Sequence, residues 1–244
     1  MAGHSQFKNI MHRKGAQDRK RASVFTKIGR EIQVAARSGL PDPAANPRLR
    51  TAITAARKAG MPKDNIDRAI ARGSGEGGGE ALEELRYEGY GPGGVAVIVE
   101  VLSDNRNRTA AELRTLFNKG NGTLGDTNAV SFLFDRCGEM TFDATTADAE
   151  TMFEAAADAG ANDCQTSATE HTITTDPDAL SQVREMLETR FGESTRSGLV
   201  WRAQSAEPPT EPETLARFLE SLDDHDDVQD VWVNTDLSAL EQVS

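Results

Sequence analysis

The sequence is short of cysteine, of aromatic residues and of long apolar runs, and these shortages exclude several classes of protein. Its two cysteines, Cys137 and Cys164, stand far apart, without a CxxC pair or a cluster of histidines. We therefore expect neither a disulfide framework nor a zinc site, and a reducing cytoplasm suits the chain. No apolar run approaches the roughly 18 residues that cross a bilayer, and residues 1–21 are too polar for a secretory signal. The chain is expected to be cytoplasmic, with no membrane partner.

Motifs for catalysis are also missing. There is no GxSxG or HExxH pattern and no cysteine placed with a histidine, and the carboxylates are scattered. Residues 89–94, GYGPGG, fit the string GxGxxG, but a dinucleotide fingerprint follows a strand and opens a helix, whereas this string precedes a strand. We expect an exposed loop there, beside Tyr87 and Tyr90. No enzyme activity, catalytic residue, cofactor or metal is expected.

Charge is distributed unevenly along the chain. The net charge is −12, yet residues 1–72 hold 16 Lys and Arg against 5 Asp and Glu, and residues 73–244 hold 11 against 34. Basic residues that only solvate helix faces would be mixed with acidic ones. A block of one sign instead indicates a module for a polyanion, carried on an acidic body.

Apolar spacing predicts three short helices in the basic block. The first covers residues 14–38, the second runs from an N-cap at Asn46 to Gly60, and the third from Pro62 to Gly73. The glycine-rich residues 72–80 then predict a linker. A phosphate loop is the alternative for this stretch, but no preceding strand and no Lys-Ser/Thr pair supports it. We assign residues 1–80 to a basic helical domain.

The remainder alternates between strands and helices. We expect a strand at 95–102, a helix at 107–119, a strand at 130–134, and, near the end, a helix after Pro212 and a strand at 228–233. Between them, residues 139–204 predict strand, helix (147–159), strands (163–168 and 171–175), helix (178–191) and strand (196–203), which is the ferredoxin-like order. The predicted fold is α+β: a three-helix N-terminal domain followed by two ferredoxin-like sheet domains, one inserted in the other. The sheet domains are residues 81–135 with 205–244, and the inserted residues 136–204.

The first 30 residues are the richest in groups that bind nucleic acid. Residues 2–13 have too little apolar surface to order themselves, and we expect them to fold on their partner. The histidines suit hydrogen bonds to phosphate better than a metal, because no third ligand lies near them. The candidate contacts are His4, Ser5, Phe7, Lys8, His12, Arg13, Lys14, Gln17, Arg19, Lys20, Arg21, Lys27 and Arg30.

A second candidate anion site lies at residues 104–109, DNRNRT, which open a predicted helix. The helix dipole disfavours cations there, so Arg106 and Arg108 destabilise the helix unless they meet an anion. That anion is either an external phosphate or a carboxylate of the acidic body, and the sequence leaves both open.

Several motifs resemble those of the YebC family. The opening MAGHSQFKNI with HRKGAQD at 12–18 is similar to the family's signature, and the similarity continues through FTK (25–27), AANPRLR (44–50), MPKDNI (61–66), YEGYGPGGVA (87–96) and DNRNRT (104–109). It is dense in the N-terminal half, whereas the C-terminal half agrees more in length and layout. Gln6 and Phe7 replace a Lys and a Trp of the family's opening motif, which removes one charge and shrinks one stacking surface.

The resemblance implies three domains around a cleft and a function in gene expression. Family members are described as transcriptional regulators that bind DNA. Relatives, among them a mitochondrial translational activator of cytochrome oxidase, act on ribosomes, and bacterial members are linked to elongation through proline-rich stretches. The expected partner is DNA or, as the alternative, ribosomal RNA or tRNA on the ribosome.

Two other classes of function remain open at this level. A protein partner in the acidic interdomain cleft would make the chain an adaptor, and residues 80–244 alone would then keep its activity. A nuclease would cleave strands in a metal-dependent way. No predicted helix sets out Asn, Gln or Arg for base reading, so we expect weak sequence specificity.

Overall fold

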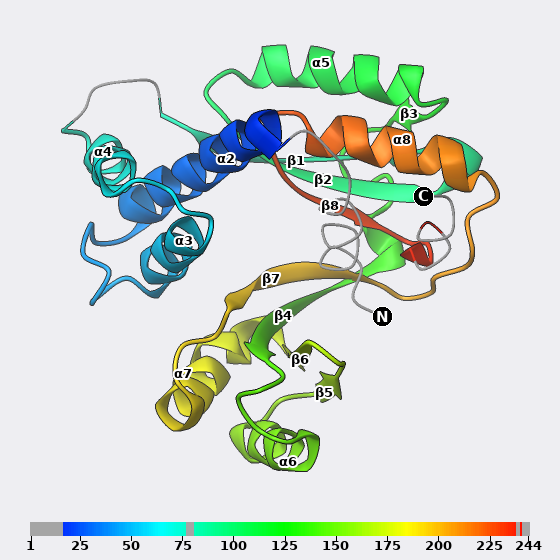
Figure 1. The fold of residues 1–244 in the computed structure, drawn as a ribbon. Helices are drawn as coiled ribbons and strands as arrows, with labels where there is room; N and C mark the ends of the chain where they lie inside the picture. Colours follow the sequence, from blue (N-terminus) through cyan, green and yellow to red (C-terminus); the bar gives the residue numbers. More distant parts are fainter. Residues whose placement is uncertain (1–16, 77–80, 238–239, 241–244) are drawn as a thin grey trace. The chain divides into compact units, whose positions relative to one another are not determined.

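The computed structural model describes residues 17–76, 81–237 and 240, the side chains of residues 17–20 excepted. The chain divides into two compact units, residues 1–135 with 202–244 and residues 136–201. The boundaries expected at residues 80 and 204 remain predictions. Figure 1 traces the elements, and none of the described helices is long and apolar enough to cross a membrane.

Three helices follow one another at the start of the larger unit: α2 (Gln17–Ser38), α3 (Pro47–Lys58) and α4 (Lys63–Gly73). They form a bundle of their own in Figure 1. The core of this bundle contains Ile32, Leu49 and Ile53 together with several alanines, so it buries little apolar area per residue. Small side chains also let the helices approach closely, and α2 packs along both α3 and α4.

The turn between α2 and α3 depends on Asn46, which is only 6% exposed. Its Oδ1 accepts the N–H of Leu49 at 3.1 Å and so caps α3, as its position before Pro47 predicts. Its Nδ2 donates to the carbonyl oxygens of Ala35 (2.7 Å) and Leu40 (2.8 Å). One side chain therefore begins α3 and satisfies a free carbonyl at the end of α2.

The larger unit also holds a four-stranded antiparallel sheet in the order β3-β1-β2-β8. Its strands are β1 (Glu83–Tyr90), β2 (Ala96–Ser103), β3 (Thr123–Leu124) and β8 (Val228–Val233). Helix α5 (Arg106–Lys119) connects β2 to β3. If the chain is read from β2, with β1 counted after β3, the sheet has the ferredoxin-like strand order. The position between β2 and β3 is occupied by β1, which precedes both in the chain.

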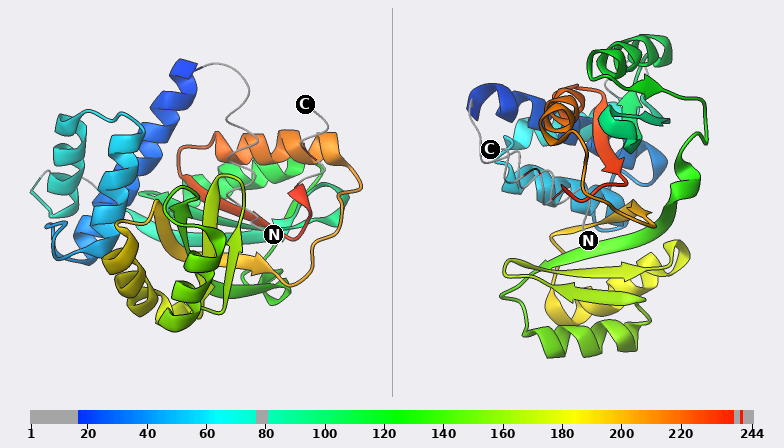
Figure 2. Two further views of the ribbon diagram at one scale, coloured as in Figure 1. Left: turned by 60° about the horizontal axis from the view of Figure 1, so that its bottom comes forward. Right: turned by 90° about the vertical axis from the view of Figure 1, so that its right-hand side faces the viewer.

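Helices α5 and α8 (Pro212–Asp223) cover one face of this sheet (Figures 1 and 2). Alternate valines of β2 and β8 point into the core between the sheet and the helices. There the rings of Phe117 and Phe218 meet edge to face, with their centroids 5.0 Å apart. This core is larger and more aromatic than that of the three-helix bundle.

The smaller unit has the predicted βαββαβ order and a second antiparallel sheet, β5-β6-β4-β7. Its elements are β4 (Phe134–Asp143), α6 (Ala149–Ala159), β5 (Asp163–Thr166), β6 (Glu170–Thr175), α7 (Leu180–Phe191) and β7 (Arg196–Ala203). Met140, Phe142 and Ile173 of the sheet pack against Met152 of α6 and Leu187 of α7. The α+β class, with helices first and sheets after them, is thus confirmed.

Two local predictions are wrong. Strand β1 was not predicted, and the loop expected at residues 89–94 covers only residues 91–94, where Pro92–Gly94 form a 3-10 turn. The strand expected at 130–134 is a short 3-10 turn, Ser131–Leu133, after which β4 begins. The cause is Glu88 of β1, whose buried Oε2 accepts the N–H groups of Val130 and Ser131, both at 2.9 Å. These amides bind a carboxylate and cannot join a strand ladder.

Substitution of Asn46 tests the turn between α2 and α3. Asn46→Ala removes the cap and leaves the buried carbonyl group of Ala35 and the partly buried one of Leu40 without their donor, so we expect a loss of about 2–4 kcal/mol in the free energy of unfolding. Asn46→Ser keeps a cap acceptor and should lose about 1 kcal/mol less. Urea unfolding followed by circular dichroism measures both. Equal losses for the two variants would contradict the role of the side chain as a cap.

Candidate nucleic-acid interface

The candidate contacts of the first 30 residues fall into three groups. Seven lie outside the described residues: His4, Ser5, Phe7, Lys8, His12, Arg13 and Lys14. Gln17, Arg19 and Lys20 lie in the first turn of α2. The remaining three, Arg21, Lys27 and Arg30, follow along the same helix, and their side chains differ in surroundings.

Arg21 is exposed, and its guanidinium lies over the ring of Phe25, 5.4 Å from the centroid. This stacking holds an arginine side chain on the helix surface without neutralising its charge. Arg21 therefore keeps its charge at the surface, and its contact with a nucleic acid stays a prediction.

Lys27 and Arg30 contact the acidic end of α8 and the loop after it. The Lys27 ammonium donates to Asp223 Oδ1 at 2.9 Å and to the carbonyl oxygen of the same residue. Arg30 donates to the carbonyl oxygens of Leu102 (2.9 Å) and Asp226 (3.0 Å) and to the carboxylate of Asp227. Their positive charge is thus balanced inside the protein.

Asp227 is the centre of this network, with a side chain that is 3% exposed. It accepts hydrogen bonds from Arg30, from Thr109 and from Arg108, whose Nη2 lies 3.0 Å from Oδ2. Burial by itself would raise the pKa of Asp227. The hydrogen bonds from Thr109, Arg30 and Arg108 outweigh burial, and the pKa lies well below the usual range of an aspartate.

The DNRNRT segment resolves into one paired and one exposed arginine. Arg108 donates to Asp104 at 2.9 Å as well as to Asp227, and these hydrogen bonds raise the pKa of its guanidinium. For Arg108, the anion is therefore a carboxylate of the acidic body and not an external phosphate. Arg106, at the first position of α5, is exposed and has no ion-pair partner within the described part of the chain.

A second ion-pair cluster joins α2, α3 and β1. Arg48 contacts Glu31 through Nε (2.7 Å) and Nη2 (3.1 Å), and its Nη1 contacts Glu84 at 2.7 Å. Burial raises the pKa of Glu31 above its usual range, although the hydrogen bonds and charge of Arg48 act in the opposite direction. Such a bidentate arginine is engaged in structure and not open to a ligand.

Glu112, His225 and Asp227 bring three potential metal-ligand atoms within 4.8 Å of one another. The ligand atoms of these three side chains already take part in hydrogen bonds and ion pairs within the protein. Glu112 lies 2.9 Å from His225 Nε2, and His225 Nδ1 accepts the backbone N–H of Asp227 at 3.1 Å. Since Arg108 also borders both carboxylates, the group fits an ion-pair network better than a cation site.

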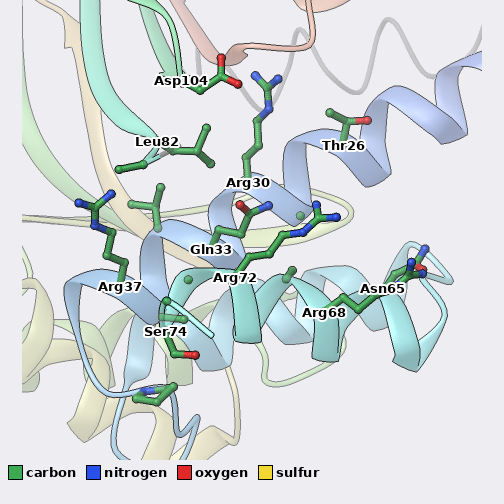
Figure 3. Close-up of a pocket in the computed structure, with 18 of the residues that line it drawn as sticks. Thr26, Arg30, Gln33, Arg37, Asn65, Arg68, Arg72, Ser74, Leu82 and Asp104 are labelled. Carbon is green, nitrogen blue, oxygen red and sulfur yellow. The ribbon is translucent and has the colours of Figure 1, made fainter. Parts of the chain in front are cut away.

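A groove of about 1270 Å³ runs between α2 and α4 (Figure 3). From α2 it is lined by Arg30, Gln33 and Arg37, and from α4 by Arg68 and Arg72. Figure 3 shows the side chain of Arg30 pointing away from Arg68 and Arg72, toward Asp104, and its own carboxylate partner is Asp227. Leu82 and Asp104 complete the lining from outside these helices, and the Asp104 carboxylate is already bound by Arg108. The groove carries polar groups on both helical walls.

Three arginines of this groove are unlike Arg30. Arg37 and Arg72 are exposed, and neither side chain has a hydrogen-bond or ion-pair partner among the residues that the structure describes. Arg68 bonds to Asn65 and, at 3.1 Å, to the carbonyl oxygen of Asp64, but to no carboxylate in the same part of the chain. An anion in the groove would therefore meet uncompensated guanidinium groups.

Arg37, Arg68 and Arg72 were not predicted as individual contacts, although they belong to the basic block. A signal was present: Arg68 and Arg72 are four residues apart, on the side of α4 away from its buried Ile66 and Ala69. Their alignment with Arg37 depends on the packing of α4 along α2, which no local pattern reveals.

Two protein-family models match the chain. The one for the TACO1/YebC protein N-terminal domain matches residues 5–76, and the one for the TACO1/YebC second and third domain matches residues 82–235. The chain belongs to the TACO1/YebC family. Among solved structures, it is similar to a conserved hypothetical protein from Aquifex aeolicus, with 43% identity over 90% of this chain and 91% of that one and a TM-score of 0.81.

Membership of the TACO1/YebC family supports a regulatory, nucleic-acid-binding role, since the model for the second and third domain is named for transcriptional regulation. The N-terminal model covers α2, α3 and α4. The uncompensated arginines and most of the groove's lining therefore lie in the N-terminal domain of this family.

Asp227→Asn tests the network that holds α2. Because the folded state favours the carboxylate, the stabilisation is complete above the ordinary aspartate pKa of about 3.9 and is lost as the pH falls below it. We expect the variant to lose about 3 kcal/mol at neutral pH, since two arginines lose their shared partner. The difference from the unsubstituted protein should narrow below about pH 4.

Denaturant unfolding between neutral and acidic pH measures this difference. Asp226→Asn is the matched control, because the Asp226 side chain is exposed and only its carbonyl oxygen contacts Arg30. A difference that stays constant down to acidic pH would show that the charge of Asp227 is not what stabilises the fold.

Proposed function

We propose that this protein is a nucleic-acid-binding regulator whose N-terminal domain contacts the phosphate backbone, with regulation of transcription through DNA as its role. The observation that carries the proposal is the set of arginines, Arg37, Arg68 and Arg72, that face a groove without carboxylate partners in the described residues. They belong to a block of 72 residues with an excess of 11 positive charges. Phosphate contacts supply most non-specific affinity for nucleic acid and release counterions.

The acidic remainder of the chain, residues 73–244, is not expected to contact the nucleic acid directly. Its carboxylates repel a polynucleotide and so direct it to the N-terminal domain. Residues 1–16 and the first turn of α2 add Lys8, Arg13, Lys14, Arg19 and Lys20 to the proposed interface. Lys27, Arg30 and Arg108 are engaged in internal ion pairs, and we assign them to holding α2 in place rather than to primary contacts.

A ribosome-associated role with ribosomal RNA as the ligand is the second candidate, as a translation factor that supports elongation through proline-rich sequences. One observation favours it. Asp64 and Asp67 lie on the exposed side of α4, where they would oppose the phosphates of a duplex if α4 entered its major groove as a recognition helix. A shaped RNA surface does not require a helix in a groove.

Crosslinking in cells, followed by sequencing of the attached nucleic acid, separates the two candidates. Enrichment of promoter DNA supports transcriptional regulation. Enrichment of ribosomal RNA supports the second candidate.

Charge reversal tests the interface itself. The triple variant Arg13→Glu, Lys14→Glu and Arg21→Glu should weaken binding to a DNA fragment and to a structured RNA by about 30-fold or more at moderate salt. The slope of log Kd against log salt should fall by roughly 0.7–0.9 for each lost phosphate contact. Fluorescence anisotropy across a salt series measures both quantities.

The control carries the same change in charge on the acidic body: Arg114→Glu, Lys119→Glu and Arg217→Glu, three exposed positions on α5 and α8. It should bind within about twofold of the unsubstituted protein once salt is moderate. Equal losses for the two triple variants would mean that net charge, and not the N-terminal domain, determines binding.

A further inference from the structure

We infer that the groove between α2 and α4 holds a single, unpaired strand of nucleic acid, RNA or DNA, with its phosphates on the arginines and its bases in the groove. This inference rests on the proposed function and specifies the ligand of the same domain. It assigns Arg37, Arg68 and Arg72 to the phosphates of an unpaired strand, and it leaves contacts with the outside of a DNA duplex to the basic residues at the start of the chain, among them Arg13, Lys14 and Arg21.

The two helices close the bottom of the groove. At Gly73, a Cβ atom would lie 2.8 Å from the Cβ of Ala36 and still closer to the carbonyl oxygen of Gln33, so the helix backbones touch there. Gly60, just before α4, lies close to Arg21 near the start of α2. The two helices thus run side by side in the same direction, and the groove follows their length.

The size of the groove favours one strand over two. Its volume of about 1270 Å³ slightly exceeds the roughly 300–1,000 Å³ of cavities that enclose small ligands. That space suits a few nucleotides of one strand. A duplex is convex and would rest on the rim, where its paired bases could not reach the lining.

Two of the arginines, Arg68 and Arg72, are spaced for consecutive anionic groups. Arg68 and Arg72 are one helical turn apart, with Cβ atoms about 5–6 Å from each other, and Arg37 lies on the opposite wall. A guanidinium binds phosphate with two parallel N–H groups, which a lysine cannot do. All three cations of this set are arginines, which suits phosphate recognition.

The lining also contains groups that suit bases. Gln33 and Asn65 carry amides that can donate to and accept from the edge of an unpaired base. Phe25 and Met61 add apolar surface. Unpaired bases expose both their edges and their faces, and arginine planes or aromatic rings stack on those faces. An acidic peptide would use the arginines but not these groups, and a duplex would not reach them.

Anisotropy with four labelled probes tests the inference on the full chain: an oligouridylate of about 12 nucleotides, the deoxy form of the same strand, a duplex of the same length, and a polyglutamate peptide of similar charge. Both single strands should bind about tenfold or more tightly than the duplex. Arg72→Ala and Arg68→Ala should each weaken single-strand binding by about tenfold. Their effect on duplex binding should be less than about threefold.

Arg57→Ala is the matched control, since Arg57 is an exposed arginine in the last turn of α3 that does not line the groove. It should change single-strand affinity by less than about twofold. Gln33→Ala tests base contact separately, because a residue with only a structural role would not change which base is preferred. It should alter the preference among homopolymeric strands and leave the salt slope unchanged, because it removes no charge. Thermal unfolding confirms that each variant is folded.

Photocrosslinking with thiouridine-containing strands locates the ligand independently, and crosslinks to the α2 and α4 peptides that line the groove are expected. Crosslinks confined to residues 1–16, or an Arg57→Ala loss equal to that of Arg72→Ala, would overturn the inference. So would duplex binding as tight as single-strand binding, although nucleic-acid binding would then stand. Polyglutamate binding as tight as that of the strands would identify an acidic-peptide site instead. No binding of any nucleic acid would overturn the proposed function as well.

Discussion

The arrangement of the larger unit depends on one buried carboxylate that two arginines share. Asp227 receives Arg30 from α2 and Arg108 from α5, and Arg30 also reaches the carbonyl oxygen of Leu102 at the end of β2. A desolvated charge is costly unless it is paired, and here the pairing spans three elements that are distant in sequence. The network therefore fixes how α2 lies against the sheet, and with it the direction in which the rest of α2 faces.

This constraint divides the positive charge of the N-terminal block between two tasks. Lys27, Arg30 and Arg48 contact carboxylates and hold the bundle to the sheet. Arg37, Arg68 and Arg72 face the groove instead and retain their charge for a ligand. Buried pairs are screened by salt much less than exposed charges are, so ionic strength that weakens a polynucleotide contact leaves the Arg30–Asp227 pair largely intact. Binding can therefore be reversible without loosening the fold.

Much of the fold was predictable because its elements carry strong local patterns. The helices of the N-terminal block and the βαββαβ order of the smaller unit follow from apolar periodicity and from caps such as Asn46. β1 escaped prediction although it alternates, because its outward side chains are charged and its partners come from β2 and β3. The segment at 130–134 is apolar enough for a strand, but Glu88 occupies two of its amides across the fold. Both errors arise from interactions between residues far apart in the chain.

The same distinction applies to the candidate site. The sequence alone determined that the chain carries a cationic block on an acidic body, since charge is a property of composition and needs no fold. It also determined the family, through motifs that are contiguous. Only the tertiary structure decided which cations are balanced and which remain open, because a salt bridge depends on distances of a few ångströms between residues as far apart as Arg30 and Asp227. The groove is tertiary for the same reason, since its two walls come from separate helices that meet at Gly73.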